Sequence, residues 1–471
     1  MTTVITYGTY DLLHYGHIRL LKRAKALGDY LIVGITADDF DKTRGKINVQ
    51  QSLMERIEAV RSTGLADQII VEEYEGQKID DIRRYNVDIF AIGSDWNGHF
   101  DYLKDYCQVV YLERTEGVSS SEIRAEEHNL RLGMVGETVT VQKYLRESRY
   151  VNGAQVTAIY ALDRSWLPQD QAALSVDNFD ILLDNCDAVY IASHPSRHAA
   201  QVRQALERGK HVLCESPIAT TEAECVQLFN LAEQNHLILM DSIKTAYSTA
   251  YNRLLLMLKG GKIGHILSVD ATCTSLRDVS SEAARERTWS SICNWGPTAL
   301  LPIFQILGTD WTHRQASSLV MDSDDFFDLF TRIDFIYQDA VASMKVGTGV
   351  KSEGELIVSG TKGYVYIPAP WWKTDYFEVR YENAEDNRRY FYQLDGEGIR
   401  YTIAAFLKSI NLGQNVTYVD PGISTHICRI VEEIQSGTNV NRLSPQEGAA
   451  PPDRSDAGLL FDKPKRGLTD R

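Results

Sequence analysis

The fold is decided by the stretch Gly8-Thr9-Tyr10-Asp11-Leu12-Leu13-His14-Tyr15-Gly16-His17, which lies between a strand pattern and a helix pattern. Residues 3–7 predict a strand, and the apolar residues of 17–27 recur at helical spacing until Gly28. In an open α/β sheet, ligands bind where a strand gives way to a helix. The free N–H groups and the positive dipole of such a helix start favour a phosphate. The stretch therefore predicts a phosphate site.

Two histidines give this junction its chemistry. His14 and His17 are three residues apart, so both imidazoles can face one point at a helix start. Gly8 and Gly16 allow the backbone to approach a ligand closely. Two imidazoles aimed at one phosphate can stabilise the charge that grows on it during a displacement. A lone histidine is more often an ordinary surface or core residue, but the H-x-G-H spacing favours a catalytic pair.

Strand and helix patterns alternate outward from this stretch. Further strands are expected at residues 30–36, 68–71, 87–92 and 108–112, and helices at 52–63 and 79–85. Such alternation predicts a parallel, doubly wound α/β sheet, which we assign to a domain of residues 1–127.

After Glu126 the pattern restarts as a second nucleotide-binding-like fold. Its strands are expected at residues 130–135, 156–162, 188–193 and 211–214, with a helix at 198–208. From about Ile266 the chain is rich in strands, at 266–272, 329–337, 340–346, 354–359, 364–367 and 376–381. We expect a Rossmann-like domain at 128–250, an α+β open-sheet domain at 251–436 whose sheet is largely antiparallel, and a disordered tail at 437–471.

Composition limits the classes of function. The chain has 471 residues, which suits two or three domains, and its formal net charge of −15 argues against binding nucleic acid or acidic membranes. No apolar run reaches the about 18 residues of a membrane span, and the first residues lack a secretory signal pattern. The seven cysteines form no C-x-x-C pair, so neither a disulfide framework nor a zinc site is indicated. We expect a cytoplasmic protein.

Three motifs in the first quarter of the chain resemble those of known nucleotidyltransferases. The H-x-G-H stretch resembles the signature of the HxGH nucleotidyltransferase superfamily, and Arg114-Thr115-Glu116-Gly117-Val118-Ser119-Ser120-Ser121 resembles the R-T-x-G-I-S-T-T signature of cytidylyltransferases. Gly93-Ser94-Asp95-Trp96-Asn97-Gly98-His99-Phe100-Asp101 resembles a stretch of glycerol-3-phosphate cytidylyltransferases, and the spacing from Lys46 to Arg56 also matches that family. The resemblance covers about residues 3–125.

The resemblance implies transfer of CMP from CTP to a polyol phosphate, with glycerol 3-phosphate as the expected acceptor and Mg²⁺ bridging phosphates. It implies catalytic roles for His14, His17, Lys46 and Arg114. It implies nucleotide contacts for Gly8, Thr9, Tyr10, Gly16, Gly93, Asp95, Trp96, Arg114, Thr115, Ser119, Ser120 and Ser121. Acceptor contacts are expected from Asp11, Arg56, Lys78 and Asp95, although Lys78 is equally well interpreted as a solvated surface lysine. No side-chain metal ligands are identified.

The second half resembles the Gfo/Idh/MocA family of NAD(P)-dependent oxidoreductases. The segments that resemble this family are His194-Pro195-Ser196-Arg197-His198, 209–219, 258–266 and 360–364, within a resemblance that spans about residues 130–436. It implies the fold of that family and, in an intact member, an NAD(P) site.

This half departs from the family at each position that carries its chemistry. The family's E-K-P is here Glu215-Ser216-Pro217, and a serine cannot supply the cation of that lysine. The glycine fingerprint keeps Gly136, but Thr138 and Val141 stand where small residues are expected, and Thr138 would crowd a pyrophosphate. The family's D-x-G-x-H reads Asn294-Trp295-Gly296-Pro297-Thr298, without acid or imidazole. We therefore predict that this half does not perform standard hydride transfer.

The sequence leaves four hypotheses about the function of the chain open. The first is a CDP-polyol-forming enzyme that assembles as a homodimer or larger homo-oligomer and supplies cell-surface polymer synthesis. The second is a bifunctional enzyme whose C-terminal half is an NAD(P)-dependent reductase that supplies the polyol phosphate, with Lys244 replacing the lost lysine and Asp163 as a ribose ligand. The third makes that half a binding module for a sugar or a protein. The fourth replaces CTP by another nucleotide such as ATP.

Overall fold

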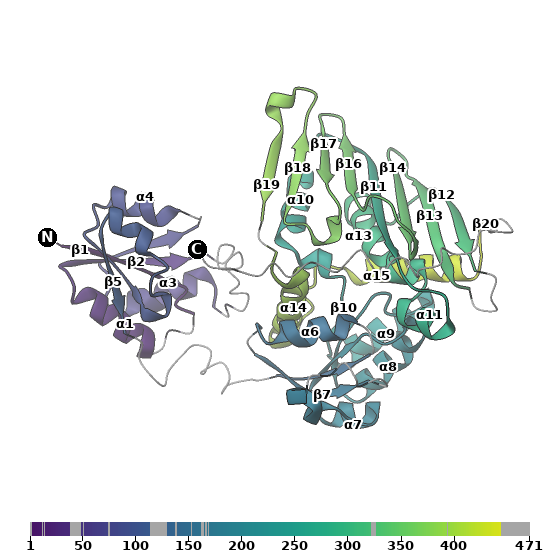
Figure 1. Cartoon of the computed structure of the whole chain (residues 1–471), viewed down its shortest axis with the longest axis horizontal. Helices are drawn as coiled ribbons and strands as arrows, with labels where there is room; N and C mark the ends of the chain where they lie inside the picture. The colour runs from purple at the N-terminus through teal and green to yellow at the C-terminus, as the bar shows by residue number, and fades with distance from the viewer. Residues whose placement is uncertain are drawn as a thin grey trace, which may run out of the picture.

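The structure is a computed structural model that describes residues 2–11, 13, 15–37, 49, 51–73, 76–113, 130–136, 139–151, 153–161, 164, 167, 169–321, 326–392 and 394–443. The N-terminal unit, purple to blue in Figure 1, alternates strands and helices. Its elements are β1 (Thr3–Gly8), α1 (Tyr15–Lys25), β2 (Tyr30–Thr36), α3 (Leu53–Ser62), β3 (Gln68–Glu72), α4 (Gln77–Arg84), β4 (Ile89–Gly93), η1 (Ser94–Trp96), η2 (Asp101–Asp105) and β5 (Gln108–Leu112).

The five strands of this unit form one parallel sheet in the order β3-β2-β1-β4-β5. The predicted doubly wound sheet is therefore confirmed. Because the strands are parallel, their carboxyl ends meet at one edge, and the order reverses between β1 and β4. That edge carries the strand ends Gly8, Thr36, Glu72 and Gly93.

Both faces of this sheet are covered. On one face, Leu21 and Ala24 of α1 and Val60 of α3 pack against strand residues. On the other face, Ile82 of α4 and Leu103 of η2 do the same. Burial of these side chains fixes both helix layers, because each apolar stripe has only one sheet face to cover.

The second α/β unit has a parallel sheet in the order β10-β9-β8-β6-β7. Its elements are β6 (Leu130–Val135), α6 (Val139–Ser148), β7 (Ala154–Tyr160), η3 (Gln169–Leu174), α7 (Phe179–Asp184), β8 (Ala188–Ile191), α8 (Pro195–Glu207), β9 (His211–Cys214), α9 (Glu222–Gln234) and β10 (Leu239–Asp241).

The remaining chain builds a ten-stranded sheet with helices packed on it. The connecting and helical elements are η4 (Lys244–Tyr247), α10 (Thr249–Lys259), α11 (Glu282–Thr288), α12 (Ser291–Asn294), α13 (Gly296–Leu307), η5 (Trp371–Lys373), η6 (Ala384–Asp386), η7 (Asp395–Gly398), α14 (Ile399–Leu412) and α15 (Pro421–Gln435). The strands are β11 (Ile266–Leu276), β12 (His313–Val320), β13 (Asp328–Ile336), β14 (Val341–Gly347), β15 (Gly349–Val350), β16 (Leu356–Gly360), β17 (Tyr364–Ile367), β18 (Tyr376–Arg380), β19 (Arg388–Phe391) and β20 (Val440–Leu443).

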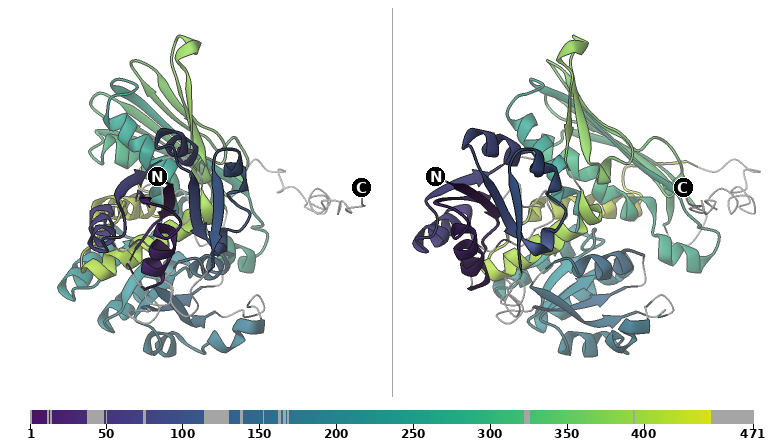
Figure 2. Two further views of the ribbon diagram at one scale, coloured as in Figure 1. Left: turned by 90° about the vertical axis from the view of Figure 1, so that its left-hand side faces the viewer. Right: turned by 60° about the vertical axis from the view of Figure 1, so that its left-hand side comes forward.

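This sheet and the second α/β unit share one core. Leu132 and Met240 of the α/β unit belong to the same buried cluster as Met344, Trp371 and Phe406. Helix α14 packs against α6 and so joins the two. Figure 1 shows the sheet above the α/β unit with β19 and β20 at its edges, and Figure 2 shows the β18–β19 hairpin projecting at the top.

The expected, largely antiparallel character of this sheet is confirmed, and one boundary needs correction. Two of its strand pairs are parallel, because β11 pairs parallel with β14 and β12 pairs parallel with β20. A parallel pair needs a crossover connection, and the helices that precede β14 and β20 in the chain permit one. The predicted tail is wrong for Val440–Leu443, which form β20; residues 444–471 lie outside the described residues.

Candidate functional site

The turn after β1 is closely packed. Tyr10 is buried with a positive φ of 53°, and a Cβ at Gly8 would lie 3.0 Å from the Tyr10 ring. Asp11 is also buried, and its carboxylate accepts a hydrogen bond from the Gln51 N–H at 3.0 Å. His17 lies in the first turn of α1, with its ring centroid 5.5 Å from that of Tyr10 in an edge-to-face contact. The turn therefore places one histidine of the predicted pair at the sheet edge.

A buried arginine ties this turn to the neighbouring strand. Arg56 on α3 is fully buried, and its guanidinium donates to the carbonyl oxygens of Thr9 at 2.7 Å and Thr36 at 2.9 Å. Its Nε donates to the Gln51 carbonyl at 3.1 Å. The expected acceptor contact of Arg56 stays a prediction, and the contacts described here join its guanidinium to the backbone at the carboxyl ends of β1 and β2.

Lys78 lies in a buried polar cluster at the same edge. On α4 it forms an ion pair with Glu72, the last residue of β3, and both side chains are buried. Its ammonium lies 4.6 Å from the Tyr7 ring centroid, and the Thr36 hydroxyl donates to Glu72 at 3.0 Å. The interpretation of Lys78 as a solvated surface residue is therefore wrong. The cation lies where the carboxyl ends of β1, β2 and β3 meet.

The sequence did not indicate the polar residues that surround Lys78 and Glu72. The Tyr7 hydroxyl donates to Asp81 at 2.8 Å, and Gln77 donates to Asp81 at 3.0 Å and to the Val71 carbonyl at 2.7 Å. Burial and, next, the charge of Asp81 raise the pKa of Tyr7 well above its usual value, so the phenol stays a donor. The available signal was the spacing of residues 77, 78 and 81, which puts three polar side chains on one helix face.

The segment after β4 forms an aromatic wall beside the sheet edge. The Trp96 ring centroid lies 5.3 Å from that of His99 and 5.7 Å from that of Phe100, and Trp96 keeps 38% of its surface exposed. The Phe100 N–H donates to the Tyr111 hydroxyl at 3.2 Å, which holds the segment against β5. An exposed indole here offers a planar surface for a base to stack on.

Several predicted site residues lie outside the described part of the chain. They are His14, Lys46, Arg114, Thr115, Ser119, Ser120, Ser121 and the side chain of Asp95. Other described members lie at or after the carboxyl ends of the strands that position them: Gly8, Thr9, Tyr10, Asp11, Gly16 and His17 at the end of β1 and the start of α1, and Gly93 and Trp96 at and after the end of β4.

In the second α/β unit, the turn after β6 keeps one glycine of the dinucleotide fingerprint, Gly136. Gly136 has φ 138°, and a Cβ there would lie 2.4 Å from the Ala192 carbonyl oxygen, so the first glycine is required. Val141, in place of the third small residue, is fully buried in the apolar core. Thr138 and Asp163 lie outside the described residues.

The residues at the lost dehydrogenase positions have structural partners. The Ser216 hydroxyl donates to Asp241 at 3.2 Å, and the Ser216–Pro217 peptide bond is cis. Glu215 is partly buried and accepts hydrogen bonds from the Tyr190 hydroxyl at 2.7 Å and the Ser242 hydroxyl at 3.0 Å. The Trp295 indole donates to Ser275 at 3.1 Å. None of these three side chains is a cation or an imidazole.

Asp241 gives this unit a pH-dependent stability. Burial raises the pKa of Asp241 to about 7, although the hydroxyls of Ser424 and Ser216 lower it in part. Since the folded pKa exceeds the unfolded one, this contribution to stability is present below about pH 4 and is lost as pH rises through 7. Between pH 5 and pH 8, we expect the free energy of unfolding to fall by about 2 kcal/mol more in the wild type than in Asp241→Asn. Calorimetric melting at both pH values measures this difference, with Asp386→Asn, at an exposed position, as the control. Equal losses of stability in the wild type and in Asp241→Asn would contradict the expectation.

Among the helices of the described residues, none is long and apolar enough to cross a membrane. The same part of the chain contains no group of three His, Cys, Asp or Glu side chains suited to a metal ion.

Comparison with known proteins agrees with both halves of this architecture. The cytidylyltransferase-like family model matches residues 5–126, and the model of the oxidoreductase family with an NAD-binding Rossmann fold matches residues 130–242. The glycerol-3-phosphate cytidylyltransferase of Staphylococcus aureus is 49% identical over 130 residues, which is 27% of this chain and 95% of that protein. The enzyme of the same name from Bacillus subtilis is 49% identical over 126 residues, 27% of this chain and 97% of that protein.

For the second half, a crystal structure of a 3-ketoreductase from Actinomadura kijaniata matches with a TM-score of 0.60 at 18% identity, over 68% of this chain and 100% of that one. At this identity the match shows the fold alone. The H-x-G-H junction, the parallel sheet and the relatives together establish that the chain belongs, through residues 5–126, to the glycerol-3-phosphate cytidylyltransferase family of nucleotidyltransferases, fused to a Gfo/Idh/MocA-type oxidoreductase fold.

Proposed function

We propose that the N-terminal unit transfers CMP from CTP to glycerol 3-phosphate and releases pyrophosphate. The observation that carries the proposal is the H-x-G-H sequence at the β1–α1 junction, with His17 in the first turn of α1 at the sheet edge. The relatives named glycerol-3-phosphate cytidylyltransferases support the acceptor, because they align over nearly their whole length.

In the proposed reaction, a phosphate oxygen of the acceptor attacks the α-phosphorus of CTP. A new P–O bond forms as the bond to the β-phosphate oxygen breaks, and pyrophosphate leaves with that electron pair. The start of α1 and the imidazoles of His14 and His17 would stabilise the charge on the crowded α-phosphate. Lys46 and Arg114 would neutralise charge on the triphosphate, and Mg²⁺, when bound with CTP, would supply further positive charge there. Catalysis then consists of positioning and charge stabilisation, without a covalent enzyme intermediate.

The remaining residues divide into binding and positioning roles. Thr9, Trp96 and the segment Arg114–Ser121 would bind the nucleotide, with the base against the exposed indole. Asp11, Lys78 and Asp95 would face the acceptor. Arg56 would act through the backbone that it fixes, because its guanidinium is buried against carbonyl oxygens.

Pyrophosphate release measured with each of the four NTPs and a panel of polyol phosphates tests this function. We expect CTP with glycerol 3-phosphate to give the highest kcat/KM, by about 100-fold over ATP with the same acceptor. Glycerol without phosphate is the matched control for acceptor charge and should give no turnover above background. Preference for another nucleotide, or equal rates with unphosphorylated glycerol, would refute the proposal.

For the C-terminal half we propose a role other than standard hydride transfer, in assembly as a homo-oligomer, ligand capture or regulation. The supporting observation is that Ser216, Asn294 and Thr298 replace the family's cation, acid and imidazole. Fluorescence titration of the full chain with NADPH and NADH should show neither enhanced emission nor a shifted maximum. Saturable enhancement, together with oxidation on adding a keto sugar phosphate, would favour the bifunctional alternative.

A further inference from the structure

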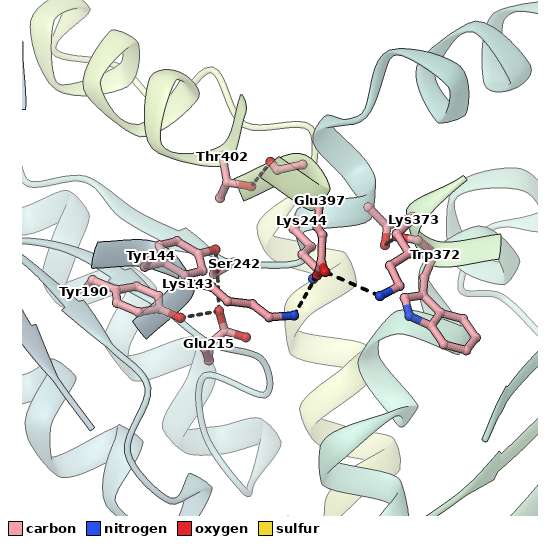
Figure 3. A network of polar contacts seen from close by, with 12 residues as sticks. Lys143, Tyr144, Tyr190, Glu215, Ser242, Lys244, Trp372, Lys373, Glu397 and Thr402 are labelled. Carbon is pink, nitrogen blue, oxygen red and sulfur yellow. Dashed lines mark hydrogen bonds and ion pairs between the residues drawn. The ribbon is translucent and has the colours of Figure 1, made fainter. Parts of the chain in front are cut away.

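Three lysines converge on a single carboxylate between the second α/β unit and the sheet region. Lys143 of α6 and Lys244 of η4 lie 2.8 Å and 3.0 Å from one oxygen of Glu397, and Lys373 of η5 lies 3.4 Å from the other. Figure 3 shows the three ammonium groups approaching Glu397 from separate elements. One carboxylate therefore faces three cations, which leaves a local excess of positive charge in a chain whose net charge is −15.

Glu397 reaches this position from a strained turn. Its φ and ψ are 55° and 24°, and it lies between Gly396 with φ 57° and Gly398 with φ 87°. A left-handed conformation is sterically unfavourable for a non-glycine residue, so contacts from outside the turn must hold it. A Cβ at Gly396 would collide with the Glu147 carboxylate, and one at Gly398 would lie 3.1 Å from the Lys244 carbonyl oxygen. The turn is therefore in close contact with α6 on one side and with η4 on the other.

An accessible cavity adjoins this cluster. It has a volume of about 410 Å³ and is lined by Lys143, Arg146, Glu147, Arg149, Tyr150, Gly396, Glu397 and Ile399. Two of these lining residues contact Arg400, whose guanidinium pairs with Glu147 at 2.5 Å and lies 4.0 Å from the Tyr150 ring centroid. The side chains of Lys143, Lys244, Lys373 and Glu397 are 26–37% exposed, so solvent and solutes reach the carboxylate.

The electrostatics agree with a site built for an anion. Burial alone would raise the pKa of Glu397, but hydrogen bonds and charge from Lys143 and Lys244 lower it to about 2. Burial lowers the pKa of Lys244, and Glu397 acts in the opposite sense. Glu397 and Lys244 therefore each favour the charged form of the other. Removing the carboxylate leaves three ammonium groups that repel one another unless another anion enters.

We propose that Lys143, Lys244 and Lys373 form a binding site for the phosphate group of a phosphorylated small molecule, and that Glu397 occupies this site as an internal anion that the ligand displaces. A phosphate monoester carries up to two negative charges and three acceptor oxygens, which matches three ammonium donors better than one carboxylate does. Displacement would release the strained turn, and since α14 follows it directly and packs on α6, the turn links the site to the contact between the two regions. The proposal is independent of the cytidylyltransferase reaction.

Calorimetric titration of the full chain with inorganic phosphate tests this site. Glu397→Gln keeps the side-chain shape but removes the competing charge, so we expect it to bind phosphate about tenfold more tightly than wild type. Adding Lys244→Gln to that variant should abolish the gain. Lys259→Gln, at the exposed end of α10, is the matched control and should leave the affinity unchanged. An unchanged affinity in Glu397→Gln, or a gain that survives the loss of Lys244, would overturn the proposal.

Two further measurements separate this site from the N-terminal unit and from a loss of folding. The rate of pyrophosphate release should be the same in Glu397→Gln and wild type, so a change in phosphate affinity is not attributed to the N-terminal unit. If Glu397→Gln lowers the melting temperature too far for titration, Lys143→Gln alone is measured. We then expect phosphate affinity to fall by about threefold or more, as for loss of one charge-assisted hydrogen bond. An affinity equal to that of Lys259→Gln would reject the site.

Discussion

His17→Ala is expected to lower kcat for CMP transfer by about 100-fold or more, with a smaller change in the KM for CTP. His17 lies in the first turn of α1, where helix N–H groups and the imidazole can meet the same phosphate. A group that stabilises charge present only in the transition state contributes to kcat rather than to ground-state binding. His14→Ala is expected to have an effect of similar size, from the other member of the pair.

Single-turnover pyrophosphate release distinguishes this role from a structural one. His236→Ala, an exposed histidine after α9, is the control and should leave the rate unchanged. Both catalytic variants should keep the melting temperature of the wild type within a few degrees, because His17 contributes a partly exposed ring to the packing. Near-normal rates in His14→Ala and His17→Ala would remove the proposed mechanism.

Arg56→Met is expected to destabilise the N-terminal unit by about 3–5 kcal/mol and to reduce activity with it. The buried guanidinium donates to the carbonyl oxygens of Thr9, Thr36 and Gln51, so methionine would leave buried acceptors without their donor. Those carbonyls belong to the ends of β1 and β2 and to the start of α3. The substitution should therefore loosen the edge that carries the site and not merely lower stability elsewhere.

Hydrogen exchange of the full chain measures this effect locally. Amides of β1 and β2 should lose protection in Arg56→Met, whereas amides of β8 and β9 in the second α/β unit should not change. Arg61→Met is the matched control on the same helix, because its ion pair with Glu58 is exposed and should contribute less than about 1 kcal/mol. Equal protection in the two variants would show that the Arg56 contacts do not fix the site.

The N-terminal fold and the place of its site were predictable from sequence for a local reason. The strand, the glycine-containing turn and the helix start lie within 17 residues, so spacing alone brings His17 to the sheet edge. The role of Arg56 and the burial of Lys78 were not predictable in this way. Each depends on contacts between elements far apart in the chain, such as Lys78 with Tyr7, and charged residues are buried only when such partners exist.

In the second half, the replacement of the family's cation, acid and imidazole by Ser216, Asn294 and Thr298 could be recognised from sequence, because the surrounding motifs are intact. The lysine cluster could not be recognised from sequence, because its members are far apart in the C-terminal half of the chain. They are Lys143, Lys244, Lys373 and the carboxylate partner Glu397. The parallel pairing of β20 with β12 was missed for a similar reason. A short strand after a helix is indistinguishable from a polar terminal segment until its partner strand is known.

The most direct test of the central claim is a crystal structure of the full chain with CTP. We expect the triphosphate to lie against the start of α1, between the carboxyl ends of β1 and β4, within hydrogen-bond distance of the His17 imidazole. A nucleotide bound anywhere else, including the cavity beside Lys143 and Glu397, would contradict it.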